Sequence, residues 1–91
     1  MIWVTHAAAL PDYRLALSFS DGSSGVIDLR EFVFSDPRPI VAALRSAAAF
    51  AAIRVASDTV VWDNGFDLAP EFLYARLNRV VGPVYSTEVT S

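Results

Sequence analysis

The sequence predicts an α+β domain in which two short helices pack on one face of a small, mostly antiparallel sheet of about five strands. The sheet is predicted by strict apolar–polar alternation over residues 13–19 and by two pairs of strand-like segments, each pair joined by a short turn sequence. The helices are predicted by segments that follow each hairpin and begin with proline. A chain of 91 residues is long enough for one such domain.

The first hairpin occupies the N-terminal third of the chain. Residues 2–9 are expected to form a strand that ends at a Leu-Pro-Asp sequence. Residues 13–19 and 25–29 form the hairpin, with Asp21 and Gly22 in its turn, because glycine tolerates the positive φ that such turns need. The alternating apolar residues that share one face of each strand are Tyr13, Leu15, Leu17, Phe19, Ile27 and Leu29.

The middle of the chain is predicted to be helical. Residues 30–34 suit either one helical turn or an irregular link. A helix is expected to follow over residues 36–46, capped by Asp36 and with prolines in its first turn. Ser46 is expected to cap a further turn that Phe50 anchors. The expected inward stripe of the main helix is Ile40, Val41 and Leu44.

The second hairpin joins residues 52–57 to residues 59–63 through a turn at Ser57 and Asp58. A last helix is expected over residues 70–79, with Glu71 in its first turn, where an acid suits the positive end of the helix dipole. Its apolar side is Phe72, Leu73, Tyr74 and Leu77. Two facings of the hairpin remain open: Ile53 and Val55 with Val61 and Asp63, or with Val60 and Trp62.

The chain is expected to form one domain over residues 1–79. Residues 80–91, which follow a Gly-Pro break, are expected to be a frayed tail or a short edge strand.

Composition and charge narrow the function classes. Hydrophobic residues make up 54% of the chain, against roughly 45–50% in ordinary domains. This surplus favours a self-association or partner interface, although enrichment in alanine explains it equally well. The net charge of −3 and the singly scattered arginines disfavour direct nucleic-acid binding and are compatible with a small basic protein partner.

Other classes are excluded or disfavoured by what the sequence lacks. There is no cysteine, which excludes disulfides and thiolate metal sites and fits a reducing compartment. No run approaches the ~18 apolar residues of a membrane span, and the N-terminus lacks the basic region of a signal peptide. We therefore expect a cytoplasmic protein without membrane contact.

Two stretches of the chain resemble a known bacterial family. Residues 11–29 hold the first hairpin, and residues 60–74 lead from a strand into the last helix. Over residues 2–77 the chain is similar to the family called domain of unknown function 2442. The matching positions are Phe19, Asp21, Gly22, Asp28, Leu29, Phe50, Trp62, Gly65, Asp67, Leu68, Pro70, Leu73 and Tyr74.

The resemblance implies a fold and leaves the activity open. It implies similarity to the N-terminal domain of a larger protein from a nitrifying bacterium, in which a helix-turn-helix domain follows. Because this chain ends before such a domain, DNA reading is not expected of it. The genes that accompany family members imply a toxin–antitoxin arrangement, with this family as the antitoxin.

Oxygen-bearing side chains gather near the start of the last helix. Asp63, Asn64 and Asp67 lie within five residues, and Asp28 ends another strand. Such ligands suit a hard divalent cation. Turn chemistry explains them better, because Asn-Gly favours a tight turn and Asp67 can bond the N–H groups at the helix start. A metal or small-ligand site at Asp28, Asp63 and Asp67 is kept as the alternative.

We expect no enzymatic activity and no cofactor. His6 is the only histidine, and its apolar strand suits a structural role. The sequence shows no nucleophile with a base and an orienting group, and no glycine loop that cradles phosphate.

Four aromatic residues are candidates for a partner-binding surface. Phe32 and Phe34 are expected to be exposed, whereas Trp3 and Trp62 lie on predicted strands, where a core position competes with an interface position. The favoured function is a non-enzymatic protein-binding module, self-associating or antitoxin-like. The other alternative is a DNA-associated accessory domain that acts through a partner.

Overall fold

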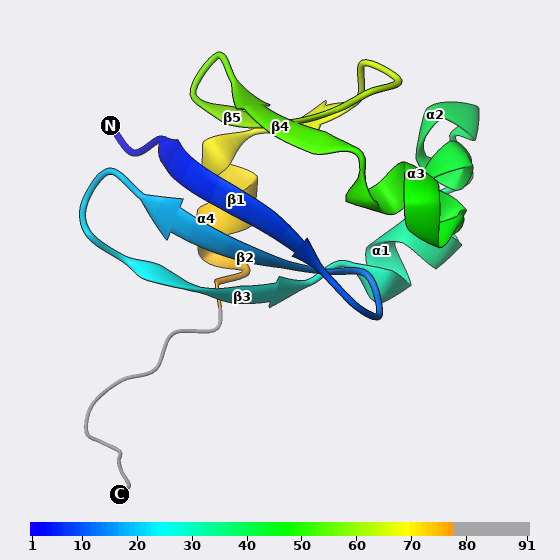
Figure 1. Ribbon diagram of the computed structural model, residues 1–91, viewed down its shortest axis with the longest axis horizontal. Coiled ribbons are helices and arrows are strands. Elements are labelled where there is room, and N and C mark those ends of the chain that lie inside the picture. The colour runs from blue at the N-terminus through cyan, green and yellow to red at the C-terminus, as the bar shows by residue number, and fades with distance from the viewer. Residues whose placement is uncertain (78–91) are drawn as a thin grey trace, which may run out of the picture.

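The computed structural model describes residues 1–77 and confirms an α+β fold with antiparallel strands (Figure 1). The strands form two three-stranded sheets instead of one sheet of about five strands. Sheet A holds β1 (Val4–Leu10), β2 (Arg14–Phe19) and β3 (Ser24–Asp28), in that order, and sheet B holds β4 (Ile53–Ala56), β5 (Thr59–Trp62) and β6 (Asp67–Leu68).

The second hairpin is extended by β6 into a separate three-stranded sheet. Val60 and Val61 of β5 pair with Leu68 and Asp67 of β6. Sheet B then packs against sheet A through β1, which contacts β4 and β5. One backbone bond joins the two sheets, from the Val4 N–H to the Asp58 carbonyl at 2.9 Å.

β2 lies in the middle of sheet A and shows the predicted alternation. Leu15, Leu17 and Phe19 are buried, and the side chains between them are partly exposed on the opposite face. β3 continues this pattern, with Ile27 buried and Val26 partly exposed. The apolar period of two therefore identified the core side of the first hairpin correctly.

The alternation predicts a strand that begins at Tyr13, but β2 begins at Arg14. Tyr13 lies in the turn between β1 and β2, where Asp12 and Tyr13 have φ angles of 64° and 63°. This left-handed conformation costs a bulky residue on the order of 1–3 kcal/mol. Two bonds hold it: the Tyr13 hydroxyl donates to the Arg45 carbonyl, and the Leu29 N–H donates to the Tyr13 carbonyl at 2.9 Å.

The second hairpin turns where the sequence predicts. Ser57 and Asp58 both have positive φ, 51° and 68°, which is the geometry of a two-residue turn between twisted strands. Of the two facings left open, the structure selects the second, because Ile53 pairs with Trp62 and Val55 pairs with Val60.

The middle of the chain folds into short helical pieces. The ambiguous residues 30–34 belong to a helix. Ser46 caps the helical piece that begins at Ala47, as predicted, by accepting a hydrogen bond from the Ala49 N–H at 3.1 Å. Phe50 is buried, as expected. The pieces are α1 (Arg30–Ser35), α2 (Pro39–Ala42), a 3₁₀ turn η1 (Ala43–Arg45) and α3 (Ala47–Ala51).

The helix predicted over residues 36–46 begins later than expected. Pro39 disfavours helical geometry at the residue before it, so Arg38 is extended and serves as the N-cap. Asp36 therefore does not cap this helix. Ile40 is 39% exposed instead of inward, whereas the rest of the predicted stripe is buried.

The last helix, α4 (Pro70–Ala75), begins at the predicted proline and has Glu71 in its first turn. Asp67 does not cap it, because Asp67 lies in β6 and the N-cap is Ala69, which has no side chain able to cap. The predicted helix end at residue 79 and the predicted tail over residues 80–91 lie outside the described residues. No helix within residues 1–77 has the length and apolar character to cross a membrane.

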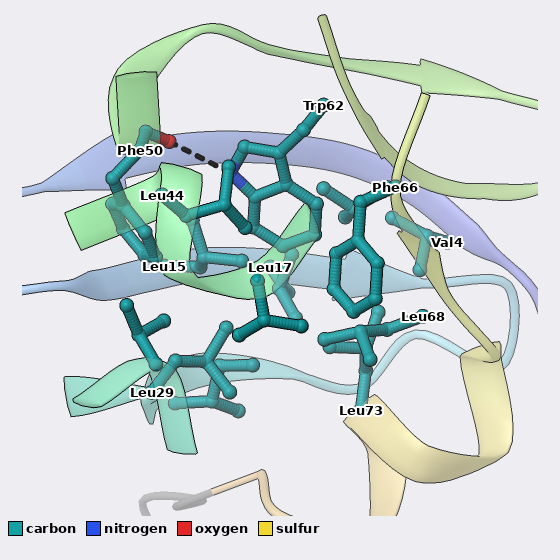
Figure 2. Close-up of a cluster of buried hydrophobic side chains, with 14 of the residues drawn as sticks. Val4, Leu15, Leu17, Leu29, Leu44, Phe50, Trp62, Phe66, Leu68 and Leu73 are labelled. Carbon is teal, nitrogen blue, oxygen red and sulfur yellow. Dashed lines mark hydrogen bonds between the residues drawn. The ribbon is translucent and has the colours of Figure 1, made fainter. Parts of the chain in front are cut away.

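The core lies between the two sheets and the helices (Figure 2). Trp62 is its largest fully buried side chain, and its indole N–H donates to the Phe50 carbonyl at 2.9 Å. This bond removes the cost of burying an unpaired donor. The other buried residues include Val4, Leu15, Leu17, Leu29, Leu44, Phe66, Leu68 and Leu73.

Candidate binding surface

The three candidate metal-binding carboxylates have different surroundings in the structure. Asp28 ends β3 and accepts a bond from the Arg30 N–H at 2.9 Å. Asp63 is exposed and forms a 3.5 Å ion pair with Arg54, and Asp67 is exposed on β6. Within residues 1–77, no group of three or more acidic, histidine or cysteine side chains is arranged to hold a metal ion.

Asn64, the first residue of the predicted Asn-Gly tight turn, has a structural role. Gly65 has a φ of 90°, as the turn requires. The side-chain oxygen of Asn64 accepts a hydrogen bond from the Phe66 N–H at 3.0 Å. The side-chain NH₂ of Asn64 donates to the Ile40 carbonyl at 3.0 Å. The amide thus connects this turn to α2.

The four aromatic candidates separate into buried and exposed residues. Trp62 is only 1% exposed and belongs to the core. Phe32 is partly buried, with its ring centroid 6.3 Å from that of Phe66 and 5.5 Å from that of Phe72. Trp3 and Phe34 are 42% and 46% exposed, so only these two present large apolar area to solvent.

Phe34 lies at the centre of a small exposed cluster, which we call the aromatic patch and define as Tyr13, Arg30 and Phe34. The Tyr13 and Phe34 ring centroids are 5.0 Å apart with the rings nearly perpendicular, at 87°. The Arg30 guanidinium carbon lies 5.4 Å from the Phe34 centroid and 5.7 Å from the Tyr13 centroid. Edge-to-face and cation–π contacts therefore hold all three side chains in place.

Arg45 supports the patch from the 3₁₀ turn η1. Its side chain donates to the Val33 carbonyl at 2.9 Å and to the Asp36 carbonyl at 3.0 Å. These bonds satisfy carbonyls at the C-terminal end of α1. Its guanidinium carbon also lies 5.9 Å from the Phe34 centroid. Phe34 therefore has one arginine from its own helix and another from η1, which follows α2 in the chain.

An ion pair fixes the link between α1 and α2. The Arg38 guanidinium donates to the Asp36 carboxylate, with the shortest contact at 2.8 Å, and the Arg38 N–H donates to the same carboxylate at 2.9 Å. The side-chain bonds from Arg38, followed by its backbone bond, hold the pKa of the Asp36 carboxyl below its usual value. The same pairing raises the pKa of Arg38.

Three arginines surround two adjoining open hollows beside the end of β3. One hollow is lined by Asp28, Arg30, Glu31, Phe32, Ser35 and Arg76, and the other by Arg14, Val26, Asp28 and Arg76. In the described part of the chain, Arg14, Arg30 and Arg76 form no ion pair, since the two ion pairs there use Arg38 and Arg54.

Sequence reasoning found Phe34 but missed the residues around it. Arg30 lies four positions before Phe34, which is the spacing of neighbours on one helix face, so a helical assignment of residues 30–34 was enough to pair them. Tyr13 and Arg45 reach the site from distant elements, and nothing in the sequence indicates that they meet.

Comparisons with known proteins agree with this fold. Residues 4–79 match the model of the family described as protein of unknown function DUF2442. The crystal structure of a Nitrosomonas europaea protein, described as a candidate DNA-binding protein, matches with a TM-score of 0.70 and 26% sequence identity. The match covers 85% of this chain and 49% of that protein, so the chain spans about half of its length. No curated protein matches.

Proposed function

The chain belongs to the DUF2442 family of proteins of unknown function, and on this premise we propose that it is a non-enzymatic protein-binding module that uses the aromatic patch. The partner in this proposal is a small protein encoded by a neighbouring gene, in an antitoxin-like arrangement. The observation that carries the proposal is the exposure of Phe34, at 46%, within a cluster of ring and cation–π contacts.

The composition of the patch suits an interface hot spot. Tyrosine and arginine are enriched among residues whose truncation weakens protein complexes most, and such residues cluster at the centre of interfaces. Side chains that are already held in place lose little conformational entropy on binding. Tyr13 and Arg30 are of these residue types, and phenylalanine is also enriched in interface cores. All three side chains meet the second condition, because each contacts the other two.

The charge of the patch selects the partner's chemistry. Arg30 and Arg45 bring two positive charges to the Phe34 ring. A complementary surface therefore offers an apolar side chain flanked by carboxylates. This local argument favours acidic groups at the contact, in contrast to the basic partner expected from the net charge of −3.

A matched pair of variants tests this proposal. The chain is co-expressed with the neighbouring gene product, and the dissociation constant is measured by calorimetry for wild type, Phe34→Ala and Ile40→Ala. Ile40 is the control, because it is also apolar and 39% exposed but lies on α2. Loss of a hot-spot side chain costs about 2 kcal/mol or more, so Phe34→Ala should raise the dissociation constant roughly 30-fold.

The control should change the dissociation constant by about twofold or less, as expected for an exposed residue outside the contact. Equal effects of the two variants contradict the use of the aromatic patch. A wild-type chain that forms no complex with that gene product contradicts the choice of partner.

A second candidate function is contact with nucleic acid. It is supported by the similarity to the Nitrosomonas europaea protein described as a candidate DNA-binding protein and by the position of Arg14, Arg30 and Arg76 around adjoining hollows. These cations are available for phosphate, because they form no ion pair within residues 1–77. This candidate departs from our expectation of no direct nucleic-acid contact.

Fluorescence anisotropy with a labelled duplex of about two helical turns tests the second candidate. If the three arginines each neutralise a phosphate, the logarithm of the binding constant should fall with the logarithm of salt concentration with a slope of about −3. Arg14→Gln should reduce the slope by about 1. Absence of binding at low salt contradicts this candidate and leaves the protein-binding proposal untouched.

A further inference from the structure

Within residues 1–77, no strand pairs with the outer edge of β3. β3 is an edge strand, since sheet A has the order β1-β2-β3. The Phe19 N–H donates to the Ser23 carbonyl at 2.8 Å, and the Leu29 N–H donates to the Tyr13 carbonyl at 2.9 Å. In an antiparallel ladder, residues that bond to the neighbouring strand alternate with residues that face away. The backbone groups of Ser24, Val26 and Asp28 therefore point to the open edge.

The other edge of sheet A is covered. β1 contacts α3, β4 and β5, and its Val4 N–H bonds to the Asp58 carbonyl. On β3, by contrast, the part of the chain that the structure describes supplies no backbone partner for Ser24, Val26 or Asp28. β3 also lacks the proline and lysine that commonly block edge pairing.

The two ends of β3 carry opposite charge. At the Asp28 end, Arg14, Arg30 and Arg76 line the adjoining hollows together with two carboxylates, Asp28 and Glu31. At the Ser24 end, the turn that joins β2 to β3 carries the exposed Asp21, whose carboxylate accepts bonds from Ser23 and from the Tyr74 hydroxyl. One end is thus net positive and the other negative.

We propose that β3 pairs antiparallel with β3 of a second copy of this chain, around a two-fold axis at Val26. Val26 then lies opposite Val26 of the second copy, and Ser24 lies opposite Asp28, so every outward backbone group gains a partner. The antiparallel direction brings the Asp21 turn of each copy to the arginine-rich end of the other. The hollow at that end receives the turn.

The pairing is self-consistent in charge and shape. The two Asp28 side chains lie at opposite ends of the paired strands, so they do not repel each other across the axis. The side chain at the axis is valine, which packs well against a β-branched neighbour on an adjacent strand. Ser24 and Gly25 are small and permit close approach. Sheet A of one copy and sheet A of the other then form one continuous sheet.

This interface is separate from the proposed function, because Phe34 lies on α1 and not on β3. Phe34→Ala should therefore dimerise like wild type. If the chain dimerises but does not bind the partner, the proposed function fails and the dimer proposal stands. If the chain binds the partner but stays monomeric, the dimer proposal fails and the proposed function stands.

Sedimentation velocity of the full chain from about 1 μM to about 1 mM, the range in which weak interfaces dissociate, tests the proposal. Wild type should form a dimer. Val26→Asp places two like charges opposite each other at the axis and should raise the dissociation constant at least about tenfold. Ala16→Asp is the control: Ala16 pairs with Val26 from the central strand β2, so it adds the same charge to the same face away from the edge.

A second variant keeps the test decisive if Val26→Asp does not fold, as judged by circular dichroism. Arg76→Glu should weaken the dimer by placing an acid beside the Asp21 turn of the second copy, and the added change Asp21→Arg should restore it. A wild-type chain that stays monomeric, equal effects of Val26→Asp and Ala16→Asp, or no effect of Arg76→Glu overturns the proposal.

Discussion

Two neighbouring groups of aromatic side chains in this protein have opposite surroundings. Phe50, Trp62 and Phe66 form the buried group, with exposures of 3%, 1% and 6%. The aromatic patch around Phe34 is open to solvent, with Phe34 at 46% exposure. Ring separations are similar, 5.7 and 5.9 Å in the buried group and 5.0 Å in the patch. Ring contacts alone therefore do not distinguish a core from a binding surface.

What differs is the polar partner of each group and the elements that cover it. The Trp62 indole donates to a buried carbonyl, that of Phe50, and the Trp62 side chain is 1% exposed. The Phe34 ring instead lies beside two guanidinium groups on helical elements. Tyr13 joins the groups, because its ring centroid lies 5.3 Å from that of Phe50. The comparison predicts that the buried group determines stability and that the patch determines binding.

The largest effect is expected for Trp62→Ala. Truncation of a fully buried aromatic side chain leaves a cavity and, here, an unpaired Phe50 carbonyl, so it should lower the free energy of unfolding by about 3–5 kcal/mol. Urea unfolding followed by circular dichroism measures the change. A loss below about 1 kcal/mol contradicts the assignment of Trp62 as the centre of the core.

Phe34→Ala sharpens the comparison from the other side. Because roughly half of the ring is already in water, its truncation should lower the free energy of unfolding by only about 1 kcal/mol. The same unfolding experiment measures it. A loss as large as that of Trp62→Ala shows that Phe34 is a core residue and removes the distinction between the two groups.

Tyr13→Phe tests the junction between the groups. The variant keeps both ring contacts and removes only the hydroxyl that donates to the Arg45 carbonyl. It should cost about 0.5–1 kcal/mol in unfolding free energy, the usual net value of one hydrogen bond. Partner binding should be retained, since the ring and its contact with Phe34 remain. An unchanged unfolding free energy argues against a role for this bond in holding the strained turn.

The smallest effect is expected for Asp36→Asn, and the difference from wild type should be present near neutral pH and disappear in acid. The pKa of Asp36 is lowered in the folded state, so its contribution is fully present above the unfolded-state pKa, about 3.9, and is lost as pH falls through the lower folded value. Wild type should therefore lose melting temperature below about pH 4 more steeply than Asp36→Asn. If the melting temperatures of the two proteins fall equally steeply below about pH 4, the assigned role of the Arg38 bonds is contradicted.

Sequence patterns predicted the local features of this fold because those features depend on near neighbours. The alternation in β2 gave the inward side of Leu15, Leu17 and Phe19, and Ser46 followed cap chemistry. The turn at Ser57 and Asp58 lies where it was predicted. Each of these depends on residues within a few positions of one another.

The errors come from interactions between distant segments. Pairing of β5 with β6 removed Asp67 from the start of α4 and divided the expected sheet in two. The left-handed Tyr13 is held by Arg45 and Leu29, which are far along the chain. The aromatic patch was not assembled from the sequence: Phe34 was named as an exposed candidate, but Tyr13 and Arg45 reach it from a distant turn and from η1. The open edge of β3 was not predicted, because it depends on which strands become neighbours.

The most direct test of the central claim is NMR shift mapping of the isotope-labelled chain during titration with the neighbouring gene product. We predict that the largest backbone amide shifts fall on the patch residues Tyr13, Arg30 and Phe34, while the Trp62 indole signal stays unchanged. Shifts that centre on sheet B, or that move the Trp62 indole signal and leave the patch unchanged, contradict the division between a stabilising buried group and a binding exposed one.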